Sequence, residues 1–169
     1  AAKVNTFLSP FFDSPARVMV NESSLAVHEG PLLAYSADGV FRYFHRAKDF
    51  GNSVAAFESA HATTLEAAAS NYPALIEGGT VVVQSESRLD DGMKTIRGVR
   101  GGIGMDDRFV YLVIARTATV PDLADVMKAL GATFALNLDG GGSAALWFGG
   151  SYAYGPGRLL PNAILFKKR

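Results

Sequence analysis

One short stretch concentrates polar groups that can do chemistry: Asn137 to Ser143, which reads NLDGGGS. Its glycines carry no Cβ, so their main-chain N–H groups are open to close approach by an anion. Asp139 supplies a carboxylate before the glycines and Ser143 a hydroxyl after them. The alternative is a glycine-rich hairpin with Asp139 capping the turn, but a hairpin rarely needs three glycines and does not explain the polar Asn137 in an apolar strand. We therefore predict a compact polar site formed by Asn137, Asp139, Gly140, Gly141, Gly142 and Ser143.

Two other polar side chains stand directly before pairs of glycines, Glu77 and Arg100. An arginine beside glycine N–H groups favours bidentate recognition of a phosphate or a carboxylate. Two carboxylates, Asp139 and Glu77, can divide the acid, base or nucleophile roles of glycosidic cleavage. Sequence separation says nothing about distance in space, so the convergence of these residues is a hypothesis. Arg100 as a surface ion-pair partner and Glu77 as a solvated turn residue stay open as alternatives.

Other kinds of site fit the sequence less well. Ser143 is expected to donate a hydrogen bond rather than to attack a substrate, because a serine nucleophile needs a general base and no histidine lies near it in the sequence. The glycines lack the lysine of a phosphate-binding P-loop. Tyr152 and Tyr154, in a Gly- and Pro-rich segment, are candidates for stacking on a ligand. No cofactor or metal site is predicted, and no role is assigned to the histidines, His28, His45 and His61.

The composition of the chain limits the classes of protein to which it can belong. With 169 residues, 49% of them hydrophobic and 19% charged, the chain is expected to fold around a core of its own. Sixteen basic and sixteen acidic residues balance, and the only basic cluster is Lys167–Arg169, which argues against nucleic acid as the main partner. The absence of cysteine excludes disulfides and thiolate catalysis. No apolar run is long enough to predict a membrane span. The chain begins at Ala1, so a removed leader stays open, and so does the localisation.

The elements expected to position Asp139 form a strand–helix–strand unit over about residues 109–139. Phe109–Ala115 is apolar on both faces and is predicted to be a central strand. A helix begins at Pro121 and ends before Gly131, because proline suits a first turn and glycine a C-cap. It leads into a strand over residues 133–139 with Asp139 at its carboxyl end, where sites of α/β units lie. A right-handed βαβ unit is the expected arrangement.

The remaining chain reads as short strands and one further helix. Asp38-Gly39 between two apolar runs predicts a β-hairpin, and the Ala-rich run Thr63–Asn71 predicts a helix. Residues 149–161 are expected to be a loop that folds over the site. The other strands are predicted at residues 4–7, 17–20, 24–27, 31–35, 40–44, 73–84 around a Gly-Gly turn, 145–148 and 162–166. The prediction is one α+β domain spanning residues 1–169, with a mixed β-sheet core and two or three helices.

With these segments in place, the chain resembles the phosphodiester glycosidase family, most strongly over residues 97–166. NLDGGGS matches the family signature. RGGIG (Arg100–Gly104) is similar to its Arg-x-x-x-Gly segment, and GRLLPNAILF (Gly157–Phe166) to its closing Arg-x-x-Pro-Asn strand. YPALIEGG (Tyr72–Gly79) and the opening VNTFLSPFF match more loosely.

The resemblance implies a hydrolase that cleaves the bond between the anomeric carbon of a sugar and a phosphate oxygen, releasing free sugar and a phosphomonoester. Asp139 and Glu77 would be its catalytic carboxylates. The substrate-binding residues would be Arg100, Asn137, Gly140, Gly141, Gly142, Ser143, Arg158 and Asn162. Its partner would be a small-molecule or glycan phosphodiester, and family members are largely secreted, periplasmic or lumenal.

Two other functions stay open at this point. One is a binding module that captures a glycophosphate or an anionic glycan without cleaving it. The other is a metal-dependent phosphodiesterase with Asp139, Asn137 and one histidine as ligands. The identity of the sugar, the stereochemical outcome and the oligomeric state are not set by the sequence.

Overall fold

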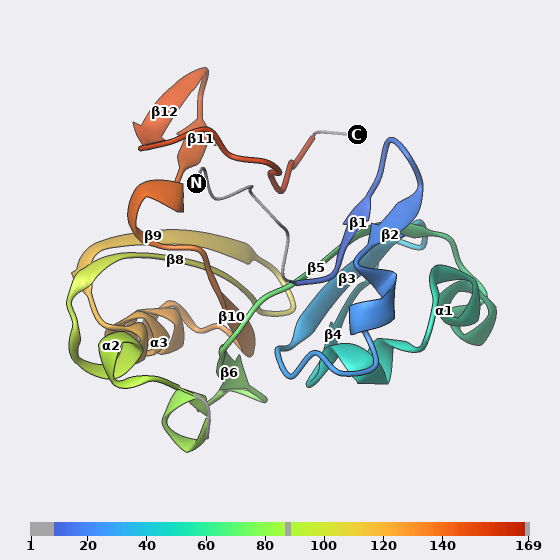
Figure 1. Ribbon diagram of the computed structural model, residues 1–169, viewed down its shortest axis with the longest axis horizontal. Helices are drawn as coiled ribbons and strands as arrows, with labels where there is room; N and C mark the ends of the chain where they lie inside the picture. Colours follow the sequence, from blue (N-terminus) through green and yellow to red (C-terminus); the bar gives the residue numbers. More distant parts are fainter. Residues whose placement is uncertain (1–8, 87–88, 168–169) are drawn as a thin grey trace, which may run out of the picture.

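The computed structural model describes residues 9–86 and 89–167, which build two five-stranded sheets with helices on their outer faces (Figure 1). Helix α1 (Val54–His61) lies on one side of the molecule and α2 (Asp91–Thr95) and α3 (Val120–Leu130) on the other. Three buried clusters fill the spaces between these layers. The predicted α+β class is confirmed. The expected opening strand at residues 4–7 lies outside the described residues.

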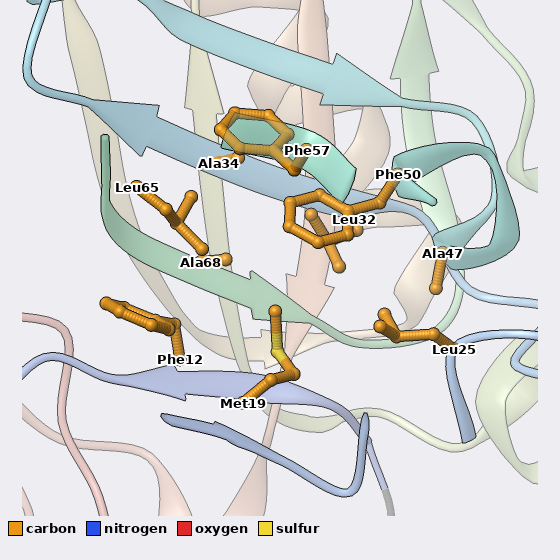
Figure 2. Packing of buried hydrophobic residues seen from close by; sticks show 10 residues of the cluster. All are labelled: Phe12, Met19, Leu25, Leu32, Ala34, Ala47, Phe50, Phe57, Leu65 and Ala68. Atoms are coloured by element: carbon orange, nitrogen blue, oxygen red, sulfur yellow. The ribbon is translucent and has the colours of Figure 1, made fainter. Parts of the chain in front are cut away.

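The first sheet is antiparallel throughout, in the order β2-β1-β5-β3-β4. Its outer face packs against α1, the 3-10 helix η2 (Ala47–Phe50) and Leu25, which follows the 3-10 helix η1 (Glu22–Ser24). Figure 2 shows the ten side chains of this cluster. The predicted hairpin at Asp38-Gly39 is confirmed, whereas the strand expected at residues 24–27 is wrong, because a 3-10 turn occupies that place. The strands are β1 (Phe11–Asp13), β2 (Val18–Val20), β3 (Leu32–Ser36), β4 (Phe41–Phe44) and β5 (Leu65–Ser70).

The helix predicted at residues 63–71 is wrong, because its Ala-rich run forms strand β5 at the centre of the first sheet. Leu65 and Ala68 point into the cluster shared with α1, and the small alanines sit opposite β3 in the register Ala34–Ala68. Pairing on both sides therefore overrides the helix propensity of alanine. The helix lies one segment earlier, where the Ser53 hydroxyl accepts a hydrogen bond from the Ala56 N–H and caps α1.

The second sheet has the order β7-β6-β10-β8-β9 and is also built of antiparallel neighbours. Helix α3 packs on its outer face and begins at Val120, one residue before the predicted start at Pro121. It ends as predicted, since Gly131 closes it with a φ of 91°. The 3-10 helix η3 (Val83–Ser85) follows β7. The strands are β6 (Ala74–Glu77), β7 (Thr80–Val81), β8 (Gly98–Met105), β9 (Val110–Ala118) and β10 (Phe134–Leu138).

The strand–helix–strand unit is present, but its two strands are not neighbours. Strands β9 and β10 run parallel, since both pair antiparallel with β8, which lies between them. Strand β9 is at the edge of the sheet, so its prediction as a central strand is wrong. Its apolar character on both faces has another cause: Tyr111 and Val113 pack toward α3, while Leu112 and Ile114 line a groove beside the C-terminal hairpin.

The C-terminal part differs from expectation in two places. The segment predicted as a loop contains strand β12 (Ser151–Tyr154), which pairs with β11 (Leu146–Phe148) in a separate hairpin. The predicted final strand at residues 162–166 is wrong, because this segment pairs with no sheet edge in the described part of the chain. The strand was predicted because these apolar side chains were expected to be buried. They are exposed instead, Leu165 to 73%. No described helix combines the length and the apolar character that crossing a membrane requires.

Candidate active site

The NLDGGGS stretch leaves the middle of the second sheet as a tight polar loop. Strand β10 ends at Leu138, and the 3-10 helix η4 (Gly141–Ser143) follows. Two of its glycines are required by geometry. A Cβ on Gly140 would lie 2.4 Å from the carbonyl oxygen of Val99 on β8, and Gly141 has a φ of 58°. Gly142 has open space where a side chain would stand, so its lack of a Cβ has no such structural cause.

Asn137 is held by two hydrogen bonds, but one of its polar atoms has no hydrogen-bond partner. Its amide Nδ2 donates to the carbonyl oxygen of Tyr72 at 3.1 Å, and its main-chain N–H donates to Pro73 at 3.0 Å. The side chain is 7% exposed, and its Oδ1 has no hydrogen-bond partner among the described residues. A buried acceptor without a donor is costly, so this oxygen is suited to receive a hydrogen bond from a buried water.

Asp139 follows at the exposed end of the strand. Its Oδ1 accepts a hydrogen bond of 3.5 Å from Nδ2 of Asn71, a residue for which the sequence predicted no role in the site. Asn71 belongs to the connection from β5 to β6, whose next residues, Tyr72 and Pro73, contact Asn137. The only sequence signal for this role was the position of Asn71 at the edge of the YPALIEGG segment.

Arg158 reaches the same loop from the chain beyond β12. Its Nε donates to the Ser143 Oγ at 2.8 Å, and the neighbouring Gly157 N–H donates to the Gly142 carbonyl at 3.1 Å. A guanidinium therefore lies beside the glycine turn that follows Asp139. The structure thus brings together Asn137, Asp139, Gly140, Gly141, Gly142, Ser143 and Arg158.

Arg100 is close by its backbone, but its side chain does not reach the glycine loop. Its guanidinium donates from Nε to the Ala118 carbonyl at 3.2 Å and from Nη2 to the Ile96 carbonyl at 2.8 Å. Side chains alternate along β8, and Arg100 shares the face of Gly102, where Met127 of α3 packs. The arginine thereby ties the end of β9 to the end of α2. Its predicted contact with a phosphate is not supported by this arrangement.

Asn162 is exposed and makes no hydrogen bond among the described residues. It lies in the C-terminal segment that does not form the expected strand. The analogy that assigned it to the site therefore has no contact to support it.

Glu77 lies at the opposite end of β10 from Asp139. It ends β6, and its Oε1 accepts a hydrogen bond of 2.9 Å from Tyr43, whose ring stacks on Phe134 at the start of β10. Because a strand rises about 3.3 Å per residue, the step from Phe134 to Asp139 covers about 16 Å. The carboxyl pairs of glycosidases are about 5 to 9.5 Å apart. Glu77 and Asp139 therefore do not face one bond, and the expected division of labour between them is not supported.

Glu77 instead belongs to a second polar group. The Nδ1 of His45 lies 2.5 Å from Glu77 Oε1, and a pocket of about 320 Å³ opens beside them. Burial raises the pKa of Glu86 in this pocket; a hydrogen bond with Tyr72 opposes the shift, and the charge of Glu77 adds to it. Burial, reinforced by Glu77, also raises the pKa of Tyr43 far above its usual range, so this phenol stays protonated as a donor. Within the described ranges, no three His, Asp or Glu side chains gather as a metal site.

Comparison with known proteins gives the family. The model of the phosphodiester glycosidase family matches residues 3–167. The chain belongs to the phosphodiester glycosidase family. A comparison with curated proteins gives no match.

Among solved structures, the chain is similar to the catalytic domain of zebrafish N-acetylglucosamine-1-phosphodiester alpha-N-acetylglucosaminidase, auto-inhibited by its pro-peptide. The TM-score is 0.65 at 16% identity, over 88% of this chain and 50% of the zebrafish chain. This likeness shows a shared fold. A hypothetical protein from Synechocystis is similar with a TM-score of 0.46 and 26% identity over 57% of this chain and 19% of its own, which is too little to inform the fold. The chain thus spans about half the length of the zebrafish relative.

Proposed function

We propose that this phosphodiester glycosidase family member hydrolyses the glycosidic bond of a sugar-1-phosphodiester at the loop that carries Asp139. The observation that carries the proposal is the hydrogen bond between Arg158 and Ser143, which sets a cation beside the glycine turn that follows an exposed carboxylate. A guanidinium together with main-chain N–H groups suits a phosphodiester, and a carboxylate suits the positive charge that develops at an anomeric carbon.

The roles follow from what the reaction demands. A phosphate monoester is a good leaving group, so the site must stabilise charge more than protonate the leaving oxygen. Arg158 and the N–H groups of the glycine turn hold the phosphate in this scheme, a role for which Arg100 is not placed. Asp139 orients the attacking water or stabilises the oxocarbenium-like centre. Ser143 donates to the substrate, and Asn137, whose Oδ1 is buried, supports the loop through its hydrogen bond to the Tyr72 carbonyl.

The test is product analysis by phosphorus and proton NMR. The protein is incubated with a panel of sugar-1-phosphodiesters, with and without a chelator, beside an Asp139→Asn variant. We expect free sugar and a phosphomonoester, unchanged by the chelator and lost in the variant. Sugar-1-phosphate and an alcohol, formed only without chelator, would identify a metal-dependent phosphodiesterase. Binding seen by calorimetry without any product would identify a binding module. Full turnover by the Asp139→Asn variant would remove Asp139 from the mechanism.

A further inference from the structure

The pocket beside Glu77 has the features of a ligand site that is separate from the Asp139 loop. Its volume of about 320 Å³ falls at the lower end of the range for small-molecule sites, about 300 to 1,000 Å³. It opens where the end of β4, the start of η2, the end of β6 and the end of η3 meet, so both sheets contribute. Its charged and phenolic lining consists of Glu29, His45, Arg46, Tyr72, Glu77 and Glu86.

Glu77 is fixed on one side and open on the other. Tyr43 and His45 both bind its Oε1, at 2.9 Å and 2.5 Å, while its Oε2 has no hydrogen bond among the described residues. The carboxylate is 21% exposed, so the pocket presents an oriented acceptor that a ligand can reach. The imidazole of His45, 55% exposed, uses Nδ1 for this contact and keeps Nε2 for another.

The charges of the pocket argue against an anionic ligand. Arg46 pairs with Glu29, Nη1 to Oε2 at 2.5 Å, and His45 pairs with Glu77, so each basic side chain of the lining already faces a carboxylate. Glu86 adds a further carboxyl group, which burial makes easier to protonate. A phosphate would find no unmatched cation among these residues.

The mixture of donors and acceptors selects the ligand class. The carboxylate of Glu77 accepts, and the ring of His45 donates or accepts according to its protonation. The guanidinium of Arg46 keeps further N–H donors beside the one that it gives to Glu29. An ammonium ion only donates, whereas vicinal hydroxyl groups donate and accept within one small ring. We propose that this pocket binds a neutral polyhydroxylated ring, a sugar, with Glu77 Oε2 and His45 Nε2 as its hydrogen-bonding contacts. The site goes beyond the proposed cleavage and does not require the Asp139 loop to be catalytic.

The experiment follows backbone amide shifts in ¹H–¹⁵N spectra while methyl pyranosides are titrated into the protein to 100 mM or below. We expect shifts at His45, Glu77 and Glu86, with millimolar affinity. The Glu77→Gln variant should bind about tenfold more weakly, because a hydrogen bond to a charged group is lost. The His45→Gln variant, altered at an exposed side chain, should also bind more weakly, which keeps the test valid if Glu77→Gln disturbs the fold.

Two controls separate this proposal from the proposed function. Asp125→Asn, at an exposed carboxylate on α3, and Asp139→Asn should leave the pocket shifts unchanged. Pocket shifts that persist in an Asp139→Asn protein without turnover support the sugar site whatever the reaction is. The proposal is overturned if no pyranoside shifts these amides, if ethylammonium shifts them and the pyranosides do not, or if Glu77→Gln and His45→Gln both bind like the wild type.

Discussion

The Nε of Arg158 donates a hydrogen bond of 2.8 Å to the Oγ of Ser143, which joins the chain after β12 to the end of the glycine turn. The sequence offered two arginines, Arg100 and Arg158, as phosphate-binding residues. This contact places the guanidinium of Arg158 beside the glycine turn. The guanidinium of Arg100 instead donates hydrogen bonds to the carbonyls of Ala118 and Ile96. The proposed function therefore assigns phosphate binding to Arg158 rather than to Arg100.

We expect Arg158→Ala to lower kcat/KM for a sugar phosphodiester by about 10- to 100-fold, the loss of one charge-assisted contact. The effect should be larger on KM than on kcat if the arginine holds the phosphate equally in the ground state. Arg108→Ala, at a cation–π contact with Phe109 on the surface, is the matched control and should be neutral. Steady-state kinetics on both variants decides; equal rates for Arg158→Ala and wild type would remove the arginine from the site.

Acid stability should depend on Asp38. Its hydrogen bond with Arg42 lowers the pKa of the Asp38 carboxyl far below the ordinary value of 3.8, and Ser36 and the Val40 N–H act in the same direction. A depressed folded-state pKa gives stability that is present above the unfolded value and is lost as pH falls toward the folded one. Asp38→Asn should therefore have a lower Tm than wild type at pH 7, and the two Tm values should converge below about pH 4. Thermal unfolding from pH 2 to 7 measures this, and a Tm difference that stays constant with pH would contradict it.

Local signals in the sequence predicted helix α3 and the polar loop after β10. Helix α3 was predicted from Pro121 at its start and Gly131 at its end, both of which act within one turn. The polar NLDGGGS loop is likewise a local pattern. Strand β5 shows the limit, because its alanines favour a helix until β1 and β3 pair on either side.

The candidate site was less predictable because the positions of two residues predicted for it depend on tertiary geometry. Arg100 was expected to face the loop, but its guanidinium donates to the carbonyls of Ala118 and Ile96 instead. Glu77 was expected to pair with Asp139, but β6 runs antiparallel to β10 and carries Glu77 to the far end. Neither the hydrogen-bond partners of a long side chain nor the direction of strand pairing is encoded by residue type or spacing alone.

Asn71 should act as a positioning residue for Asp139. Its hydrogen bond to Oδ1 is long, 3.5 Å, so Asn71→Ala is expected to lower kcat only about two- to tenfold. Asn71→Asp should be worse than Asn71→Ala, because a second carboxylate would then face Asp139. Asn52, exposed before α1, offers the control Asn52→Ala, which should leave kcat unchanged. If Asn71→Asp turns over faster than Asn71→Ala, the side chain does not orient Asp139 through this contact.

Alanine substitutions at Gly140 and Gly142, the two neighbours of Gly141, should separate an effect on stability from an effect on activity. A Cβ on Gly140 would lie 2.4 Å from a main-chain oxygen, so Gly140→Ala should force the loop off β8 and lower the free energy of unfolding by about 1 to 3 kcal/mol. A Cβ on Gly142 meets nothing within 4 Å, so Gly142→Ala should leave stability almost unchanged.

If the N–H groups of this turn hold a phosphate, the added methyl group of Gly142→Ala should still reduce turnover by crowding the ligand. Urea unfolding and kinetics on the same two variants make the comparison. Equal activity of Gly142→Ala and wild type would mean that the substrate does not approach the turn, and equal stability of the two variants would mean that β8 yields to the added methyl group.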